Sequence, residues 1–358
     1  MLRQFEDDRQ ALTLTEVVQK TGLERTICFR VLHTLLEEGL LRKAERHRYA
    51  ANFRLLSGKR FRIGYASQGH DSFCMALGQG MRWAAREHQV DLLELDNQYS
   101  PKIALRNAES LVKQGVDLAI EFQVHDRMSR KLSVLFAEAG IPVIAIEIPQ
   151  SGAIFYGVDN HKVGLIAGKA LLQAVQRDWN GEFDELLLLD LEIAGSLPHM
   201  RVSSAQSVLR KNIPGRWVTT HLESRGEFLR AFELTRKHLQ NNARRRTLLT
   251  GVNDYAVLGA LRAFEEAGRA NLCLAVGVGA MPECRRELRM PNTRLVASVA
   301  FFPERYGESA IALALDLLQA KIVPPALYAP VQLLTAKNVD QFYPKDIYHQ
   351  SDLDDLTR

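Results

Sequence analysis

Short apolar strands alternate with helical stretches along most of this 358-residue chain, and this alternation constrains the fold more than any other feature. A first series runs from "FRIGYAS" through "VDLLELDN" and "VDLAIEFQ" to "IPVIAIEI". A second series follows "YGVDN" and includes "ELLLLDL", "TLLTGVND" and "LCLAVGVG". Strands separated by helices of about 12 to 18 residues predict parallel βαβ units. Two such series predict two α/β lobes with a cleft between the carboxyl ends of their strands.

The first 60 residues lack this pattern and carry the net charge of the chain. They contain 12 Lys/Arg and 8 Asp/Glu, whereas the remainder contains 34 of each. A basic excess confined to one end indicates a part that approaches a polyanion. The hydrophobic content of 46% excludes global disorder, and the length predicts more than one domain.

Residues 12–53 are predicted to form a helix, a tight turn, a second helix and a basic β-hairpin. Thr13 or Thr15 can cap the first helix, which ends before Gly22. The second helix is expected over about residues 24–38, with Gly39 ending it in the left-handed conformation. Its buried face is predicted to contain the residues spaced at helical period: Ile27, Cys28, Val31, Leu32, Leu35 and Leu36.

The opposite face of the second helix carries the side chains that we expect to contact DNA bases: Arg25, Thr26, Phe29, Arg30 and His33. In a helix-turn-helix this face enters the major groove, where arginine reads guanine and an apolar group contacts the thymine methyl. The hairpin offers a second basic set to phosphates or to the minor groove: Arg42, Lys43, Arg46 and Arg48. A solvated charged face on a helical hairpin is the alternative interpretation.

This segment resembles the winged helix-turn-helix of IclR-type transcription regulators. The resemblance rests on a run of matching positions: Thr15, Glu16, Thr21, Gly22, Leu23, Arg30, Leu32, Leu35 and Gly39. It implies a winged helix-turn-helix DNA-binding domain over residues 1–58.

The rest of the chain, from about residue 60 to 335, resembles the type I periplasmic-binding fold of ribose-binding proteins and of the sensor domain of lac-repressor-type regulators. The phrases "IGYASQGHDSF", "AGIPVIAIE", "GVDNHKVGLIAG", "GVNDYAVLGALRAFEEAG" and "VASVAFFPERYGESA" carry this resemblance. It implies an α/β, two-lobed effector domain over residues 59–342. The implied division is lobe 1 over about 60–158 and 302–328, lobe 2 over about 159–301 and 329–342, and a polar, mobile tail over 343–358.

The resemblance also implies ligand contacts, carried over position by position: Ser67, Asp71, Phe73, Glu147, Arg201, Asn253 and Phe301. Three polar positions that hold a pentose or hexose in the family carry Ile148, Gly279 and Phe301 here. A buried polar group left unpaired costs about 1–3 kcal/mol, so a sugar site needs a partner for each hydroxyl. We therefore expect a less hydroxylated polar ligand, a sugar bound differently, or no ligand. Glu147 and Arg201 would offer opposite charges to one ligand.

Other polar residues are better explained by structure than by chemistry. Asp159, Asn160 and Asp254 are expected to cap helices or to fix the crossings between lobes. The four cysteines are far apart and the histidines show no metal spacing, so neither a disulfide framework, a zinc site nor a cofactor is expected.

These features predict a one-component transcription regulator that binds double-stranded DNA as a homodimer and senses a small molecule, sugar-like or related. A cytosolic solute-binding protein and a ligand-free dimerisation domain are the alternatives. An enzyme is not expected: there is no G-x-S-x-G elbow or Walker lysine motif, and "GVGAMP" lacks the last glycine of a dinucleotide loop. The charged start and the lack of a long apolar run favour a cytoplasmic protein with no membrane segment.

Overall fold

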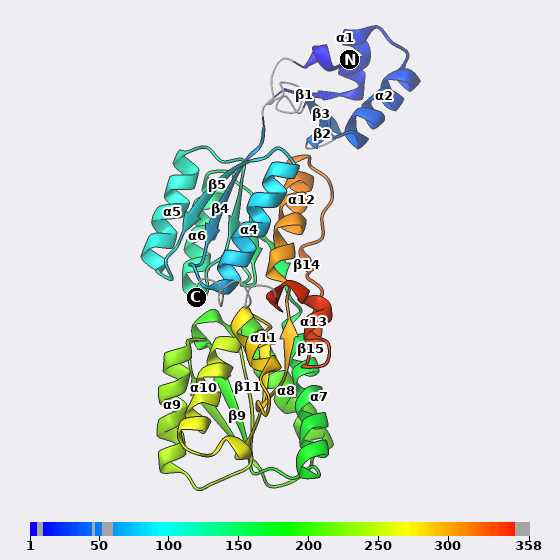
Figure 1. Cartoon of the computed structure of the whole chain (residues 1–358). Coiled ribbons are helices and arrows are strands. Elements are labelled where there is room, and N and C mark those ends of the chain that lie inside the picture. Colours follow the sequence, from blue (N-terminus) through cyan, green and yellow to red (C-terminus); the bar gives the residue numbers. More distant parts are fainter. Residues whose placement is uncertain (6–9, 45–46, 52–59, 348–358) are drawn as a thin grey trace, which may run out of the picture.

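The structure, a computed structural model of the whole chain, describes residues 1–5, 10–44, 47–51 and 60–347. A small N-terminal module lies beyond one end of lobe 1, and lobe 2 lies at the other end (Figure 1). The predicted fold class, a winged helix-turn-helix followed by a two-lobed α/β domain, is confirmed. Within the described ranges no helix meets the length and hydropathy that a membrane span requires.

The described residues of the N-terminal module form two α-helices and a three-stranded antiparallel sheet. Its elements are η1 (Leu2–Gln4), β1 (Ala11–Thr13), α1 (Leu14–Thr21), α2 (Arg25–Glu37), β2 (Leu41–Ala44) and β3 (Arg48–Ala51), with strand order β1-β3-β2. Thr13 caps α1 in a reciprocal capping box with Glu16. Gly22 and Gly39 both have a φ of +68°, a left-handed conformation that glycine adopts without steric cost. The predicted turn and helix end are therefore confirmed.

Helix α2 buries a narrower face than its periodicity predicts. Cys28 and Leu32 are fully buried, whereas Ile27 is 46% exposed. Ile27 points about 100° away from Cys28 around the helix, and the core of the module forms on the Cys28 side only. The prediction that Ile27 belongs to the core is wrong. The buried residues of this core are Phe5, Leu12, Val17, Cys28, Leu32, Leu41 and Ala51.

Lobe 1 contains a six-stranded parallel sheet in the order β14-β8-β7-β6-β4-β5. Its strands are β4 (Arg62–Ser67), β5 (Asp91–Asp96), β6 (Leu118–Glu121), β7 (Val143–Ile146), β8 (Ile154–Gly157) and β14 (Ala326–Tyr328). Its helices are α4 (Ser72–Glu87), α5 (Pro101–Lys113), α6 (Asp126–Glu138) and α12 (Tyr306–Leu318). Buried residues of α4 and α12 share one apolar core, and those of α5 and α6 share another. The helices therefore cover both faces of the sheet.

Lobe 2 repeats this plan with the strand order β10-β9-β11-β12-β13-β15, in which only β15 is antiparallel to its neighbour. Its strands are β9 (Glu185–Asp190), β10 (Val218–Glu223), β11 (Thr247–Gly251), β12 (Cys273–Gly279), β13 (Leu295–Ala300) and β15 (Gln332–Leu334). Its helices are α7 (Asn160–Trp179), α8 (Ser196–Asn212), α9 (Phe228–Asn241), α10 (Asp254–Glu266), α11 (Pro282–Arg289) and α13 (Val339–Phe342). Short 3-10 helices lie between these elements and after α13: η2 (Glu192–Ala194), η3 (Ala270–Leu272), η4 (Pro303–Arg305) and η5 (Pro344–Ile347).

The chain crosses between the lobes at three places: after β8, after β13 and after β14. These crossings lie at the same level of the molecule (Figure 1). The loops that follow the parallel strands of each lobe therefore meet between the lobes, where a ligand of this architecture binds.

The predicted polar tail begins as an ordered part of lobe 2. The carboxylate of Asp346 accepts hydrogen bonds from Arg285 at 2.6 and 2.9 Å and pairs with Arg289 at 3.2 Å. The ring of Tyr343 stacks on Phe302, with the Arg285 guanidinium 3.7 Å from its centre. Tyr343 and Asp346 thus pack against the distant helix α11 in this structure, and the mobility expected of the tail stays a prediction. Residues 348–358 of that tail lie outside the described residues.

Candidate functional site

The five side chains predicted to contact DNA bases are all exposed on α2. Phe29 is 49% exposed, and its ring lies 5.8 Å from the ring of His33. Leu23, just before α2, and Ile27, on another side of the helix, are exposed as well, at 42% and 46%. The Arg25 guanidinium reaches the hydroxyl of Thr15 at 3.4 Å. An exposed aromatic ring on the same helix face as Arg25 and Arg30 suits a groove that offers both thymine methyls and guanine acceptors.

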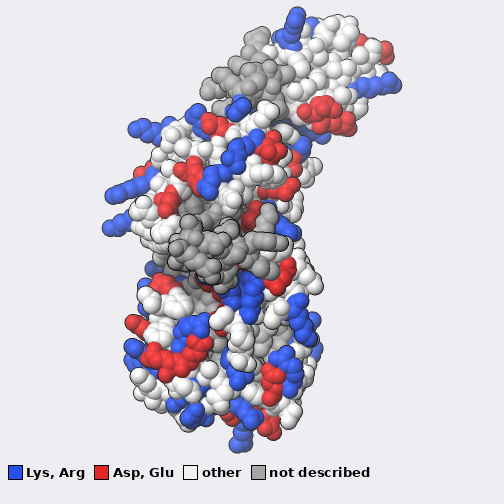
Figure 2. Space-filling view, viewed as in Figure 1, with Lys and Arg blue, Asp and Glu red and all other residues white. Residues whose placement is uncertain are grey.

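The predicted basic hairpin is present, but its arginines differ in their surroundings. Arg48 donates to the carbonyl of Ala11 at 2.7 Å and lies 3.6 Å from the Glu16 carboxylate, so it ties the hairpin to β1 and α1. Arg42 and Lys43 lie on β2, and Arg46 lies outside the described residues. Figure 2 shows blue and red side chains on the module as well as on the lobes, with blue side chains at its outer end.

Glu147 of lobe 1 and Arg201 of lobe 2 form a buried ion pair between the lobes. Glu147 follows β7 with a φ of +60°, and Arg201 lies on α8. Their side chains are 5% and 10% exposed, and Nη2 of Arg201 lies 2.5 Å from Oε2 of Glu147. The sequence resemblance placed both residues in the cleft, and the structure brings them together there. We call this pair, with the groups that hydrogen-bond it, the interlobe latch.

Other groups of the protein satisfy the interlobe latch on both sides. Oε1 of Glu147 accepts hydrogen bonds from the Tyr306 hydroxyl at 2.7 Å and from the backbone N–H of Val158 at 3.1 Å. Arg201 also donates to Oδ1 of Asn160 at 2.5 Å and to the carbonyl of Val252 at 2.9 Å. In this structure Glu147 and Arg201 are each other's partner, and the expectation that they offer opposite charges to a ligand stays a prediction.

Aromatic rings enclose the interlobe latch. Phe301, 3% exposed, lies under the Arg201 guanidinium, with 4.9 Å between the ring centre and Cζ. Phe73 packs against Tyr306 at 6.0 Å and Phe122 at 5.7 Å between ring centres. Burial, and secondarily the nearby Glu147 carboxylate, raises the pKa of Tyr306 well above its usual value, so its hydroxyl keeps its proton and donates. Phe73 and Phe301 thus share one buried cluster with Glu147 and Arg201.

The remaining predicted ligand residues have local backbone partners. Oδ1 of Asp71 accepts from the N–H of Cys74 and caps α4, and the Asn253 amide caps α10 while donating to the carbonyl of Gly226. The hydroxyl of Ser67 donates to the carbonyl of Gly69. Their contribution to a ligand therefore stays a proposal. Asp159 caps α7, as predicted, and Asp254 fixes the loop after β12 through the N–H of Met281.

A second contact between the lobes uses residues that the sequence did not single out. The backbone N–H of Ser72 donates to the Tyr255 hydroxyl at 3.1 Å, and the Ser72 hydroxyl donates to Glu283 at 2.8 Å. Ser72 begins α4 of lobe 1, whereas Tyr255 and Glu283 begin α10 and α11 of lobe 2. Their only sequence signal is a place in the first turn of a helix that follows a strand. The latch and this contact hold the lobes together.

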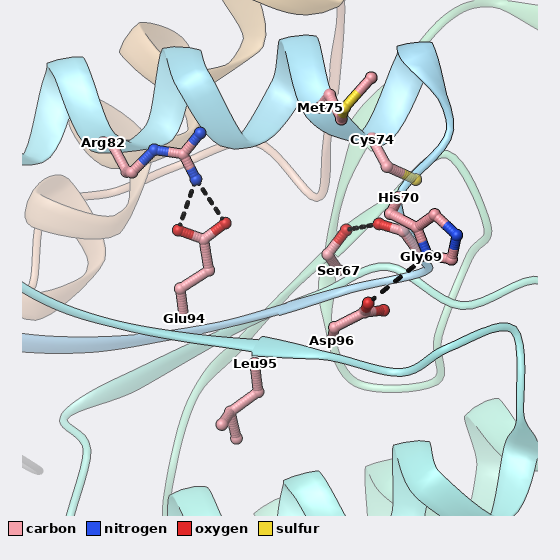
Figure 3. Close-up of a pocket in the computed structure, with 9 residues that line it drawn as sticks. All are labelled: Ser67, Gly69, His70, Cys74, Met75, Arg82, Glu94, Leu95 and Asp96. Atoms are coloured by element: carbon pink, nitrogen blue, oxygen red, sulfur yellow. Dashed lines mark hydrogen bonds and ion pairs between the residues drawn. The ribbon is translucent and has the colours of Figure 1, made fainter.

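A cavity of about 250 Å³ lies at the edge of lobe 1, beside the first half of α4. Figure 3 shows it bounded by the Arg82–Glu94 pair, with nitrogen–oxygen distances of 2.7 and 2.8 Å, and by His70 near Asp96. Of the predicted ligand residues, Ser67 lines it. The remaining lining residues are Gly69, Cys74, Met75 and Leu95.

Glu121 is a buried carboxyl group that the sequence did not single out. It ends β6, is 2% exposed, and neither of its oxygens has a hydrogen-bond partner among the described residues. Burial raises the pKa of Glu121 to about 8, so the group is largely protonated at neutral pH. A charged residue closing the otherwise apolar "LAIE" strand was the signal that could have found it.

Among the described residues no group of three or more His, Cys, Asp or Glu side chains is placed to hold a metal ion. Cys28, Cys74, Cys273 and Cys284 are all buried and free in this structure. The polar chemistry of the cleft therefore comes from the latch and its neighbours.

A winged helix-turn-helix joined to two α/β lobes that close on a buried polar cluster defines the general class of this protein. The chain belongs to the periplasmic binding protein domain family, whose model matches residues 63–322. Residues 1–45 match the IclR helix-turn-helix domain. Both resemblances seen in the sequence are thus found again by family comparison, although the second match stops before the end of the hairpin.

Three similar proteins share the fold of the two lobes. The ribose import binding protein of Bacillus subtilis is 25% identical over 284 residues, which cover 78% of this chain and 88% of that protein. A solute-binding protein from Bacillus halodurans with bound myo-inositol has a TM-score of 0.69 at 19% identity, over 80% of this chain and 98% of that one. A solute-binding protein from Actinobacillus succinogenes with bound D-allose has the same TM-score of 0.69 at 18% identity. The match covers 79% of this chain and 100% of that protein. At these identities the structural matches establish the fold.

Proposed function

We propose that this protein is a one-component transcription regulator: the N-terminal module binds double-stranded DNA, and the two lobes bind a small polar molecule that alters this binding. The observation that carries the proposal is the fusion itself. One chain joins a module with an exposed apolar and basic helix face to a closed two-lobed binding fold. The proposal assigns no catalytic activity, and it places the protein in the cytoplasm because a DNA-reading protein works where the DNA is.

The DNA side of the proposal rests on α2. Its exposed face combines Arg25 and Arg30 with Phe29, and the basic residues of the hairpin stand beside it. Phosphate contacts from the hairpin would position the module, and the helix would read bases. Such a face has no other evident use on a module whose core lies on the Cys28 side of the helix.

The ligand side rests on the interlobe cluster. Relatives of this fold bind ribose, myo-inositol or D-allose, as their names state. In this chain the polar groups near the hinge are committed to one another, and Phe301 covers Arg201. We propose a small polar effector, sugar-like or related, that contacts Phe73 and Asn253 and competes for, or rearranges around, the latch. Ser67 and Asp71 belong to this proposed contact set as well.

A homodimer is part of the proposal, because one winged helix offers a small footprint and two related half-sites enlarge it. Exposed large apolar side chains on α4, Met75 at 58% and Trp83 at 48%, are suited to contact a second copy. Sedimentation should show a dimer at micromolar concentration, and Trp83→Arg should shift it toward monomer. A purely monomeric wild-type protein, with and without DNA, would contradict this part.

One alternative has a specific observation in its favour. A latch satisfied without a ligand is what a lobe pair that serves only to dimerise would contain. A cytosolic solute-binding protein is the other alternative, and the fused DNA-binding module counts against it. Thermal shift with a panel of sugars, polyols and sugar acids distinguishes a ligand-binding regulator from a ligand-free dimerisation domain. The melting temperature of a ligand-free domain responds to none of these compounds.

The deciding experiment is selection of bound DNA from a random pool by the full-length protein, repeated with the panel. A selected sequence bound at nanomolar to micromolar Kd supports the proposal. Weaker binding by Arg30→Ala identifies α2 as the helix that contacts the bases. Arg216→Ala, which changes an exposed arginine on lobe 2, is the matched control and should leave Kd unchanged. Failure to enrich any sequence would contradict the DNA-binding role.

A further inference from the structure

Helix α12 connects the interlobe latch to the DNA-binding module. It begins at Tyr306, whose hydroxyl bonds Glu147, and ends at Leu318. The next residue, Gln319, lies against Gly39 of the module: a Cβ added to Gly39 would be 3.4 Å from Cδ of Gln319. The helix spans about 20 Å at 1.5 Å per residue. In Figure 1 it runs beside α4 from the level of the crossings to the module.

The contact at the upper end of α12 involves a buried position of the module. Gly39 is buried in the full chain, and its left-handed φ of +68° sets the course of the chain from α2 into β2. A displacement of Gln319 would therefore act on the junction between the proposed reading helix and the hairpin. These are the two parts of the module that the proposed function assigns to DNA.

The lower end of α12 is packed rigidly to α4. A Cβ on Gly307 would lie 2.0 Å from the carbonyl carbon of Gly80, and one on Gly80 would lie 2.4 Å from the carbonyl oxygen of Glu304. No side chain fits between these backbones, so α4 and the start of α12 must move together. Because Ser72 begins α4, both contacts between the lobes meet in this single helix pair.

We propose that α12 is the element that transmits the state of the cleft to the DNA-binding module. Tyr306 is the input residue, because its hydroxyl donates to the Glu147 carboxylate whose other oxygen pairs with Arg201 of lobe 2. Gln319 is the output residue, because its side chain contacts Gly39. A ligand that separates Glu147 from Arg201 leaves the carboxylate that Tyr306 bonds without its cation and shifts the helix pair against the module. This inference rests on the proposed function and names how its ligand site is coupled to DNA.

Both residues act through others, so the test measures coupling between them in the full-length protein. The variants are Tyr306→Phe, which removes only the hydroxyl, Gln319→Ala, and the double variant. Tyr65→Phe is the matched control: Tyr65 is a fully buried tyrosine of the same lobe whose hydroxyl has no hydrogen-bond partner among the described residues. The readouts are the Kd for the selected DNA and the hydrogen exchange of backbone amides 35–41.

Transmission through α12 predicts that Tyr306→Phe changes the DNA Kd about fivefold or more, the lower end of common allosteric couplings. It also predicts that Tyr306→Phe changes the hydrogen-exchange rate of amides 35–41. Tyr65→Phe should have the same DNA Kd and the same exchange rates as the wild-type protein. In the Gln319→Ala background the effect of Tyr306→Phe on both readouts should disappear. Equal values for Tyr306→Phe and wild type, or an effect that persists in the double variant, would overturn the inference.

The two readouts keep this inference separate from the proposed function. If wild-type protein binds selected DNA but Tyr306→Phe binds equally well and exchanges equally, the relay is refuted and the regulator stands. If no DNA is bound by any variant, the proposed function fails, and the exchange measurement alone decides whether α12 couples the cleft to the module.

Discussion

Glu147 and Arg201 are 54 residues apart in sequence and on different lobes, yet Oε2 and Nη2 of their side chains lie 2.5 Å apart with both groups buried. Burying two charges is costly unless each is paired and fully hydrogen-bonded, and here Tyr306, Val158, Asn160 and Val252 supply the remaining partners. The pair therefore fixes how the lobes close.

Removing one partner of the interlobe latch should destabilise the protein strongly. Arg201→Ala leaves the Glu147 carboxylate buried and uncompensated, which typically costs about 3–5 kcal/mol. The double variant Arg201→Ala/Glu147→Gln should lose less than the sum of the two single variants, because neither charge then remains alone. Urea denaturation of the three variants measures this, and strict additivity would show that the pair does not interact.

The stability of the protein should fall as pH rises, in part because of Glu121. Its pKa is raised from 4.5 to about 8 by burial, so its contribution is fully present below pH 4.5 and is lost as pH rises through about 8. Glu121→Gln should therefore gain stability relative to wild type between pH 5 and 9, by up to about 5 kcal/mol. The exposed Glu138→Gln is the control for denaturation at each pH. A pH-independent difference would exclude the buried ionisation.

Arg25 and Arg30 should contribute to base recognition. Replacing either with alanine is expected to weaken binding to the selected DNA by about 1–3 kcal/mol and to relax preference at one position. Competition binding with singly substituted DNA sites measures both effects. Uniform weakening on every sequence would instead assign the arginine to phosphate contact.

The hairpin arginines should separate into two roles. Arg48→Ala should cost the module about 1 kcal/mol of stability, because it removes the hydrogen bond to Ala11. Arg46→Ala should leave stability unchanged and reduce the salt slope of DNA binding by about 1. Thermal melting and binding at several salt concentrations distinguish these outcomes. A reduced slope in Arg48→Ala with unchanged melting would reverse the assignment for Arg48.

Ribose should give no thermal shift at millimolar concentration, despite the similarity to a ribose import binding protein. Ile148, Gly279 and Phe301 stand where the family offers polar side chains, and Ile148 and Phe301 are 5% and 3% exposed. A true effector at 100 times its Kd should add about 2.7 kcal/mol. A ribose shift that disappears in Asn253→Ala would show that these substitutions leave a sugar site intact.

The sequence by itself determined the elements and their order. Strand–helix alternation set the two lobes, and local signals set the helix ends, because a capping side chain such as Thr13 or Asp159 needs only a partner two or three residues away. The exposed face of α2 followed from helical spacing alone. The burial of Ile27 was mispredicted, because helical periodicity shows which residues share a face of the helix. It does not show how much of that face the rest of the module covers.

Tertiary structure alone decided what the cleft residues do. Glu147 and Arg201 are recognisable as cleft residues, but whether they face a ligand or each other depends on crossings that bring β7 and α8 together. The contacts of Ser72 with Tyr255, of Gln319 with Gly39 and of Asp346 with Arg285 join residues distant in the chain. No local propensity encodes such pairs, because their geometry is set only when both lobes and the module have packed.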